Sequence, residues 1–310
     1  MIITVTLNPA LDKMIRVSRL SINGVNRVTG TQLDAGGKGI NVSKVVKMLG
    51  GDTLAMGILG GESGMYIQHT LTELGVNSRF CFVDAPTRTN IKIVDESMRT
   101  ATDINERGEP VEPETLQAVF SNLMQKVQEG DTVVFAGATP PGTPVDLLAD
   151  WTQQLKELGV IVCLDTSGEA LRHAIAAGPD LIKPNKEELE ELCGSRLYFD
   201  VDVIAASKSL IAKGVSRVAV SLGAEGALFV TEDQVIRAYG VRVPVISTTG
   251  AGDAMMAALA YYMQQGLRWR EVVSRAMAVS AAHVTCPGTE TACLSQVEEL
   301  LSQVRIDELM

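Results

Sequence analysis

Apolar and polar positions alternate along this chain in two patterns, one typical of buried strands and one typical of helices. Short apolar runs such as "IITVTL" (2–7) predict strands, and amphipathic runs such as "GINVSKVVKMLG" (39–50) predict helices that end at a glycine. The same reasoning predicts further strands at 53–60, 131–137, 160–167, 179–185 and 216–223, and further helices at 64–75, 144–159 and 186–194. Strands therefore alternate with helices through most of the chain.

This alternation predicts a parallel sheet, because a helical crossover must connect each strand to the next. The strands are apolar throughout, so helices should cover both faces of the sheet. Ligands of such sheets bind beyond the carboxyl ends of the strands. The polar and glycine-rich segments lie at those ends: "LNPALD", "AGATPPG", "LDTSGE", "KPNKEE", "SLGAEG" and "TTGAGD".

Two segments depart from this pattern. Residues 11–35 and 87–103 alternate like strands with exposed polar faces, and we expect them to form a small accessory sheet, or lid. After the strand at 216–223, the pattern predicts close-set strands at 226–231, 234–240 and 241–248, followed by helices at about 252–265, 269–285 and 295–304. No linker divides the chain, so residues 1–310 are expected to form a single domain.

Composition and charge narrow the function. Of the 310 residues 46% are apolar, enough for a sizeable core, and the net charge is −10. This charge disfavours nucleic acid and membranes as partners, and a small anionic ligand would need a local cluster of Lys and Arg. The five cysteines show neither metal spacing nor a disulfide framework, and no signal peptide is recognisable. We therefore expect reduced thiols and a cytoplasmic location.

The segment "STTGAGDAMMAAL" (247–259) carries the clearest chemistry. Gly250 and Gly252 allow a turn whose amides point the same way, and the dipole of the following helix adds positive potential. Such a turn can bind a developing anion, and Asp253 beside it could take a proton from a hydroxyl that attacks phosphorus. An ordinary helix start with an acidic residue has the same pattern. The apolar helix that follows favours a functional role, because a buried carboxylate is costly.

A second glycine-rich turn, "DAGGKGINVSK" (34–44), also enters a helix. Its spacing is not that of a Walker A loop. A close backbone approach together with Lys38 suits a sugar, a phosphate or both, and Asn41 could present its amide to hydroxyl groups. The alternative is a plain strand-to-helix turn with an exposed lysine, which the three glycines in four positions disfavour.

Two further segments fit either a nucleotide site or simple structure. "KPNKEELEEL" (183–192) places Asn185 three residues before Glu188, which is either a helix capping box or a pair that orients water around Mg²⁺. "SLGAEGALFV" (221–230) is a glycine-rich turn between two strands. It could hold a nucleotide through its backbone, or it could form only a hairpin.

Other chemistries find little support in the sequence. "GILGGESG" (57–64) lacks the spacing of a dinucleotide fingerprint and does not follow the first strand. The histidines at 69, 173 and 283 lie in helical patterns, away from any plausible nucleophile. A Ser–His–Asp hydrolase is therefore disfavoured.

In their order along the chain, these motifs resemble the ribokinase-like, or PfkB, carbohydrate kinases. "GGKGINV" is similar to the N-terminal signature of the family, and "STTGAGDAMMAAL" is similar to its C-terminal signature. "TLNPALD", "GGKGIN" and "TRTNIK" most resemble the phosphosugar branch, which contains the 1-phosphofructokinases and the tagatose-6-phosphate kinases. The resemblance covers nearly the whole chain.

The resemblance implies a fold and an activity. The fold would be a ribokinase-like three-layer α/β/α arrangement, with a mostly parallel central sheet and a small β-sheet lid that often also forms a dimer. The activity would be ATP- and Mg²⁺-dependent phosphorylation of a sugar phosphate, with fructose 1-phosphate as the first hypothesis. Tagatose 6-phosphate or fructose 6-phosphate is the second. A non-catalytic sugar-phosphate sensor is the third, and an intact Asp253 argues against it, because a sensor needs no base.

The resemblance also implies roles for single residues. Asp253 matches the catalytic base, and the anion hole matches Gly250, Ala251 and Gly252. Sugar-binding positions match Asp12, Gly37 and Asn41. The cluster that grips the existing phosphate matches Lys38, Arg88 and Arg27. The nucleotide-binding positions match Lys183, Asn185, Ser221, Gly223 and Gly226, with Asn185 and Glu188 acting on the metal through water.

Four residues depart from the usual family pattern. Ala138 stands where the family commonly has a serine, and Thr285 stands where an asparagine is usual near adenine. Thr249 and Ala254 replace the common residues on either side of the Gly-Ala-Gly-Asp segment. None of these changes removes the expected base or anion hole, but they leave the identity of the phosphosugar open.

Overall fold

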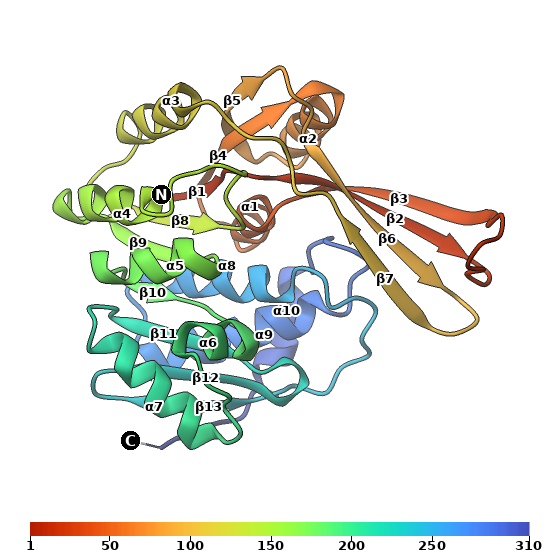
Figure 1. The fold of residues 1–310 in the computed structure, drawn as a ribbon. Helices are drawn as coiled ribbons and strands as arrows, with labels where there is room; N and C mark the ends of the chain where they lie inside the picture. Colours follow the sequence, from red (N-terminus) through yellow and green to blue (C-terminus); the bar gives the residue numbers. More distant parts are fainter. Residues whose placement is uncertain (310) are drawn as a thin grey trace.

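Ten strands form the central sheet in a computed structural model that describes residues 1–309 (Figure 1). The order of the strands is β14-β13-β12-β11-β10-β9-β8-β1-β4-β5. Their bounds are β1 Ile2–Thr6, β4 Thr53–Gly60, β5 Asn77–Val83, β8 Thr132–Ala136, β9 Ile161–Asp165, β10 Leu181–Ile182, β11 Arg217–Ser221, β12 Gly226–Thr231, β13 Val235–Tyr239 and β14 Ile306–Glu308. Neighbouring strands are parallel from β5 to β11 and antiparallel from β11 to β14, so the sheet is mostly parallel, as predicted.

Helices cover both faces of this sheet. They are α1 Lys38–Met48, α2 Gly61–Glu73, α3 Pro113–Met124, α4 Leu147–Glu157, α5 Gly168–Ala174, α6 Lys186–Cys193, α7 Asp200–Ile211, α8 Ala251–Gln264, α9 Trp269–His283 and α10 Leu294–Leu301. Helices α1, α8, α9 and α10 share one apolar core with the sheet, and α3 to α7 share another. Ile2 and Val134 enter the first core, while their neighbours Ile3 and Val133 enter the second. The predicted three-layer α/β/α arrangement is confirmed.

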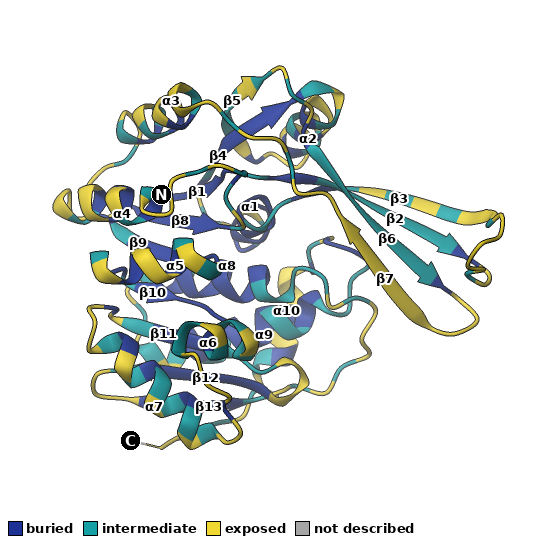
Figure 2. Cartoon of the chain, in the orientation of Figure 1, coloured by how far each residue is buried: buried dark blue, intermediate teal, exposed yellow. Residues whose placement is uncertain are grey.

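A smaller sheet projects from the edge of the body (Figure 1). Its order is β3-β2-β6-β7, with β2 at Ala10–Val17, β3 at Val28–Gly36, β6 at Arg88–Asp95 and β7 at Thr100–Asn105. We call it the lid sheet, because its strands fall largely within the two segments from which a lid was predicted. Strand β7 is exposed along its whole length, whereas β1 and β8 are buried (Figure 2).

One predicted strand was wrong. Residues 241–248 ("VRVPVIST") form no strand. Pro244 lacks the N–H that a strand pair needs, and β14 already occupies the free edge of β13. Along residues 1–309, no helix is long and apolar enough to cross a membrane.

Candidate active site

The loop before α8 forms a tight turn at the glycines of the predicted anion hole, and we call it the anion-binding turn after that predicted role. Gly250 has a φ of 81°, in the left-handed region that favours glycine, and α8 begins at the next residue. No hydrogen bond within the described residues uses the amides of Gly250 or Gly252. Two unpaired amides at the positive end of a helix dipole form a site suited to an anion.

Asp253 lies in the first turn of α8 and is buried, with 7% of its surface exposed. Asn41 of α1 donates its side-chain amide to Asp253 Oδ2 at 2.8 Å. Burial, assisted by the negative charge of Asp165, raises the pKa of Asp253 to about 6. A carboxylate whose pKa lies near neutrality is a good proton acceptor for a hydroxyl.

Asn41 offers a further polar atom beside this carboxylate. Its side-chain oxygen is buried and has no hydrogen-bond partner within residues 1–309. A buried acceptor without a donor is costly. A ligand hydroxyl at this point would satisfy Asn41, and it would also lie within reach of Asp253.

Two lysines meet on Asp165, at the carboxyl end of β9. Lys38 Nζ lies 2.8 Å from Asp165 Oδ1, and Lys183 Nζ lies 3.1 Å from Asp165 Oδ2. Burial acts to raise the pKa of Asp165, but Lys183 and then Lys38 outweigh it, and the pKa is lowered. A Cβ atom added to Gly252 would lie 3.1 Å from Lys183 Nζ, so this ammonium group lies against the anion-binding turn. Positive charge therefore supplements the free amides.

The base of the lid sheet holds other residues that were predicted to bind the sugar or its phosphate. Asp12 of β2 accepts a hydrogen bond from Asn90 of β6 at 2.9 Å, and burial raises the pKa of Asp12. Arg88 of β6 donates to the carbonyl oxygens of Asn8, at 3.2 and 3.3 Å, and of Glu106, at 2.7 Å. Gly37 precedes α1 with a φ of 116°.

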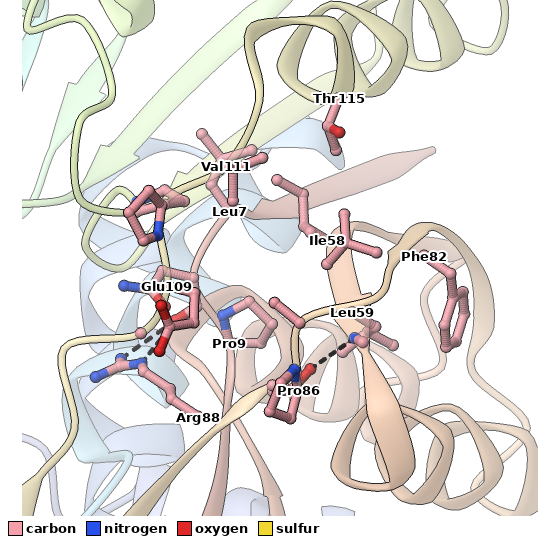
Figure 3. A pocket seen from close by; sticks show the side chains of 18 of the residues that line it. Leu7, Pro9, Ile58, Leu59, Phe82, Pro86, Arg88, Glu109, Val111 and Thr115 are labelled. Atoms are coloured by element: carbon pink, nitrogen blue, oxygen red, sulfur yellow. Dashed lines mark hydrogen bonds between the residues drawn. The ribbon is translucent and has the colours of Figure 1, made fainter.

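A cavity of about 470 Å³ adjoins this region, at the carboxyl ends of β1, β4 and β5 (Figure 3). Its walls are apolar and polar in similar measure: Leu7, Ile58 and Val111 are among the apolar residues, and Arg88 and Glu109 stand at one side. Neither Asp253 nor the anion-binding turn lines this cavity. It therefore lies beside the candidate reaction centre rather than over it.

Within the described chain, the three residues of the predicted phosphate-gripping cluster do not contact one another, and their surroundings differ. Lys38 turns toward Asp165, while Arg88 is held by backbone oxygens at the base of the lid sheet. Arg27 is exposed in the loop between β2 and β3, and among the described residues no hydrogen bond or ion pair reaches its side chain.

The predicted nucleotide residues lie at the ends of β10 and β11. Asn185 and Glu188 form a full capping box for α6, with each side chain accepting from the backbone N–H of the other at 2.8 Å. Asn185 also forms an isolated bridge with Ser221. Gly223 is exposed at the turn after β11, whereas Gly226 is buried against the backbone of β13. No cluster of three or more His, Cys, Asp or Glu in the described chain could hold a metal.

Three residues without a role predicted from the sequence also reach this site. Asp165 ends an apolar strand, a position that is a recognisable signal for an active-site carboxylate. Lys92 of β6 donates to Thr249 Oγ1 at 2.9 Å, and so reaches from the lid sheet to the anion-binding turn. The ring of His283 contacts the carbonyl of Thr249 at 3.0 Å, because the end of α9 lies against the loop before α8, whose Ile246 and Ser247 donate to the carbonyl oxygen of Val284.

Comparison with known proteins adds independent findings. Residues 5–296 match the family described as pfkB family carbohydrate kinase. The chain is 36% identical over 306 residues to a 1-phosphofructokinase of Haemophilus influenzae, covering 98% of this chain and 97% of that one. It is 41% identical over 263 residues to a 1-phosphofructokinase of Xanthomonas campestris, covering 83% and 82%. Phosphofructokinase-2 of Escherichia coli in complex with fructose-6-phosphate has a TM-score of 0.91 at 27% identity, covering 97% and 98%, and a tetrameric inhibited form of it is also known.

Proposed function

Because this chain belongs to the pfkB family of carbohydrate kinases, we propose that it transfers a phosphoryl group from ATP to fructose 1-phosphate, giving fructose 1,6-bisphosphate. It is an ATP-dependent carbohydrate kinase of the 1-phosphofructokinase type. The observation that carries the proposal is the buried carboxylate of Asp253 beside two unpaired amides. That pairing supplies a base for the acceptor hydroxyl and donors for the transferring group.

The proposed chemistry is a single in-line transfer. Asp253 takes the proton of the sugar hydroxyl as its oxygen attacks the terminal phosphorus of ATP, and the bond from that phosphorus to the bridging oxygen breaks to release ADP. Negative charge on the transferring group faces the free amides of Gly250 and Gly252 and the ammonium group of Lys183. The amide of Ala251, also predicted for the anion hole, instead donates to the carbonyl oxygen of Thr248 at 3.3 Å. Lys38 keeps Asp165 paired and adds positive charge at the same place.

The proposed sugar site lies between α1 and the base of the lid sheet. Asn41, with its unpaired side-chain oxygen, and Asp12 accept sugar hydroxyls, and Gly37 allows the backbone to approach the ring closely. Arg88 binds the phosphate that the sugar already carries, since a guanidinium group can engage a phosphate with two hydrogen bonds.

The proposed nucleotide site uses Lys183, Asn185, Ser221 and the turn that contains Gly223 and Gly226. Mg²⁺ fits this arrangement, because it is usually held by phosphate oxygens and water rather than by a cage of protein ligands. Glu188 has one carboxylate oxygen outside the capping box that could orient such a water. When bound, the metal ion would neutralise charge on the phosphates.

We also propose that the lid sheet closes over the sugar and joins two copies of the chain. The lid sheet and its loops expose large apolar side chains, which a second copy would bury: Ile22, Val25, Val28, Leu33, Met98 and Ile104. Arg27 lies in the same region and has no partner within the described chain. The lid sheet and the body then act as one domain that spans the chain.

The test is release of ADP from ATP with a panel of phosphosugars: fructose 1-phosphate, fructose 6-phosphate and tagatose 6-phosphate. The proposal expects the highest kcat/KM with fructose 1-phosphate. A higher kcat/KM with either 6-phosphate would change the proposed substrate but would leave the proposed phosphoryl transfer in place. Fructose 6-phosphate is the favoured second candidate, because it is bound by the Escherichia coli neighbour. Absence of ADP release with every sugar would leave a sensor as the function.

A further inference from the structure

Helix α9 presents two polar side chains to the anion-binding turn. Ser280 and His283 are three residues apart and therefore lie on the same face of the helix. Ser280 Oγ donates to the carbonyl oxygen of Ala251 at 3.0 Å, and His283 Nε2 lies 3.0 Å from the carbonyl oxygen of Thr249. A carbonyl oxygen can only accept, so the proton of the His283 contact is on Nε2.

The two accepting carbonyls belong to the peptide groups that carry the free amides. In a trans peptide, the C=O of one residue and the N–H of the next lie in one plane and point in opposite directions. With the oxygen of Thr249 held toward α9, the N–H of Gly250 points away from α9. With the oxygen of Ala251 held in the same way, the N–H of Gly252 points away as well. These are the amides without a partner in the described chain.

Packing reinforces this orientation. His283 is buried, with 2% of its surface exposed, and a Cβ atom at position 250 would lie 2.7 Å from His283 Nε2. The imidazole ring therefore fills the space directly behind Gly250, and the turn cannot move toward α9. Because a side chain at 250 would meet the ring and Gly250 has positive φ, glycine is required there for two reasons.

We propose that Ser280 and His283 are positioning residues that aim the amides of Gly250 and Gly252 at the transferring phosphoryl group by holding the carbonyls of Ala251 and Thr249 against α9. The inference rests on the proposed function, because it gives these amides the role of an anion hole. Neither side chain touches the substrate. Both act through the backbone of the turn, and their effect belongs to the transition state rather than to the binding of either substrate.

The test compares donor and non-donor variants. Ser280→Ala and His283→Leu each remove one donor, and each is expected to lower kcat by roughly 10- to 100-fold with little change in KM for the sugar phosphate or ATP. His283→Gln places an amide N–H near the position of Nε2 and should recover most of kcat. Ser274→Ala is the matched control, since Ser274 lies on α9 but its hydroxyl bonds within the helix, to Arg270. It should leave kcat unchanged.

A second readout separates positioning from general damage. ADP with aluminium fluoride resembles the transferring phosphoryl group, so His283→Leu should weaken binding of that complex at least tenfold while the Kd for ADP alone stays the same. Equal weakening of ADP and of ADP with aluminium fluoride would mean a structural role and would overturn the proposal. Failure of His283→Gln to recover kcat would overturn it too.

The proposed function is checked separately, with the unmodified chain. If that chain releases no ADP with any phosphosugar, the proposed function fails before any variant is made. If the unmodified chain is active and both donor-removing variants turn over normally, the proposed function stands and the positioning role is refuted.

Discussion

Asp253 is nearly fully buried, and its carboxylate receives one hydrogen bond within residues 1–309, from Asn41. Burial with so few partners raises the pKa of Asp253 to about 6. The same shift affects proton transfer and folding, because both depend on which form of the carboxyl group the folded chain favours.

We predict that the activity of the kinase depends on pH through Asp253. Protonated Asp253 cannot accept a proton, so kcat/KM for the sugar phosphate should fall about tenfold per pH unit below roughly pH 6 and level off above it. Initial rates between pH 5 and 8, at saturating ATP, measure this. Asp253→Asn should lower kcat by roughly 10²- to 10⁴-fold and lose this titration. A parent profile that stays flat to pH 5 would contradict the role of Asp253 as base.

We also predict that Asp253 makes the stability of the folded chain depend on pH. The folded pKa is raised above the usual 3.8, so between about pH 4 and 6 the folded chain keeps a proton that the unfolded chain has lost. Folding is therefore penalised increasingly as pH rises through that range, and fully above it. Asp253→Asn should stabilise the protein by about 1–3 kcal/mol at pH 7.5 and by much less at pH 4. Urea unfolding at both values measures this, and an equal effect at both would refute the explanation.

Substitutions of Arg88 and of Lys38 should change different kinetic constants. Arg88 lies at the base of the lid sheet, whereas Lys38 pairs with Asp165. Arg88→Ala should raise KM for the sugar phosphate at least about tenfold, or roughly 1.4 kcal/mol, with little effect on the unphosphorylated sugar. Lys38→Met should mainly lower kcat. Steady-state kinetics with both sugars test this. Equal losses on the two sugars in Arg88→Ala would mean that Arg88 has only a structural role.

Asn185 at the start of α6 caps the helix and also lies in the proposed nucleotide site, and two variants can separate these roles. Asn185→Ala removes the cap and should cost about 1 kcal/mol of stability, while Asn185→Asp keeps a capping oxygen and should cost little. Both variants lose the side-chain amide near the proposed nucleotide site. Thermal unfolding measures the stability that the cap contributes, and KM for ATP measures the contribution of the side chain to ATP binding. If KM rises only in Asn185→Ala, the residue serves ATP binding solely by ordering the helix.

Elements with long local patterns could be predicted from the sequence, and elements that depend on a partner could not. Helix α8 follows from its continuous apolar residues, and β8 follows from "TVVFA". Strand β14 is only "IDE", which has no strand pattern, and it forms because β13 offers a free edge. The more strand-like segment 241–248 has no such edge available and stays irregular.

For the whole molecule, we predict a dimer through the lid sheet. Ile104 of β7 is 53% exposed, and Ile104→Glu would place a charge within the proposed interface. Light scattering should give the mass of two chains for the parent and of one chain for Ile104→Glu. Tyr198→Glu is the control, since Tyr198 is 75% exposed but lies outside the lid sheet, and it should stay dimeric. A monomeric parent, or dissociation in both variants, would contradict this interface.

In the candidate site too, residues in local sequence patterns could be predicted, and residues that depend on long-range contacts could not. Glycine spacing and helix starts are local, so Gly250, Gly252 and Asp253 could be identified in the sequence. Lys92 is four residues after Arg88 and thus on the same face of β6, but its partner Thr249 is 157 residues away. The contact of His283 with the turn likewise depends on how α9 packs. Contacts between side chains of separate elements could not be predicted from the sequence, because they depend on how those elements pack in three dimensions.

The parallel pairing of β2 with β6 has a consequence for synthesis of the chain. Ala10 pairs with Arg88, and α1, β4, α2 and β5 are translated between them. At roughly 5–20 residues per second, the ribosome needs several seconds to supply β6 after β2. During that time the nascent β2–β3 hairpin has an open inner edge, which a neighbouring nascent chain on the same messenger could pair with. Slow synonymous codons between positions 37 and 87 would lengthen this interval, and would increase aggregation without altering any residue.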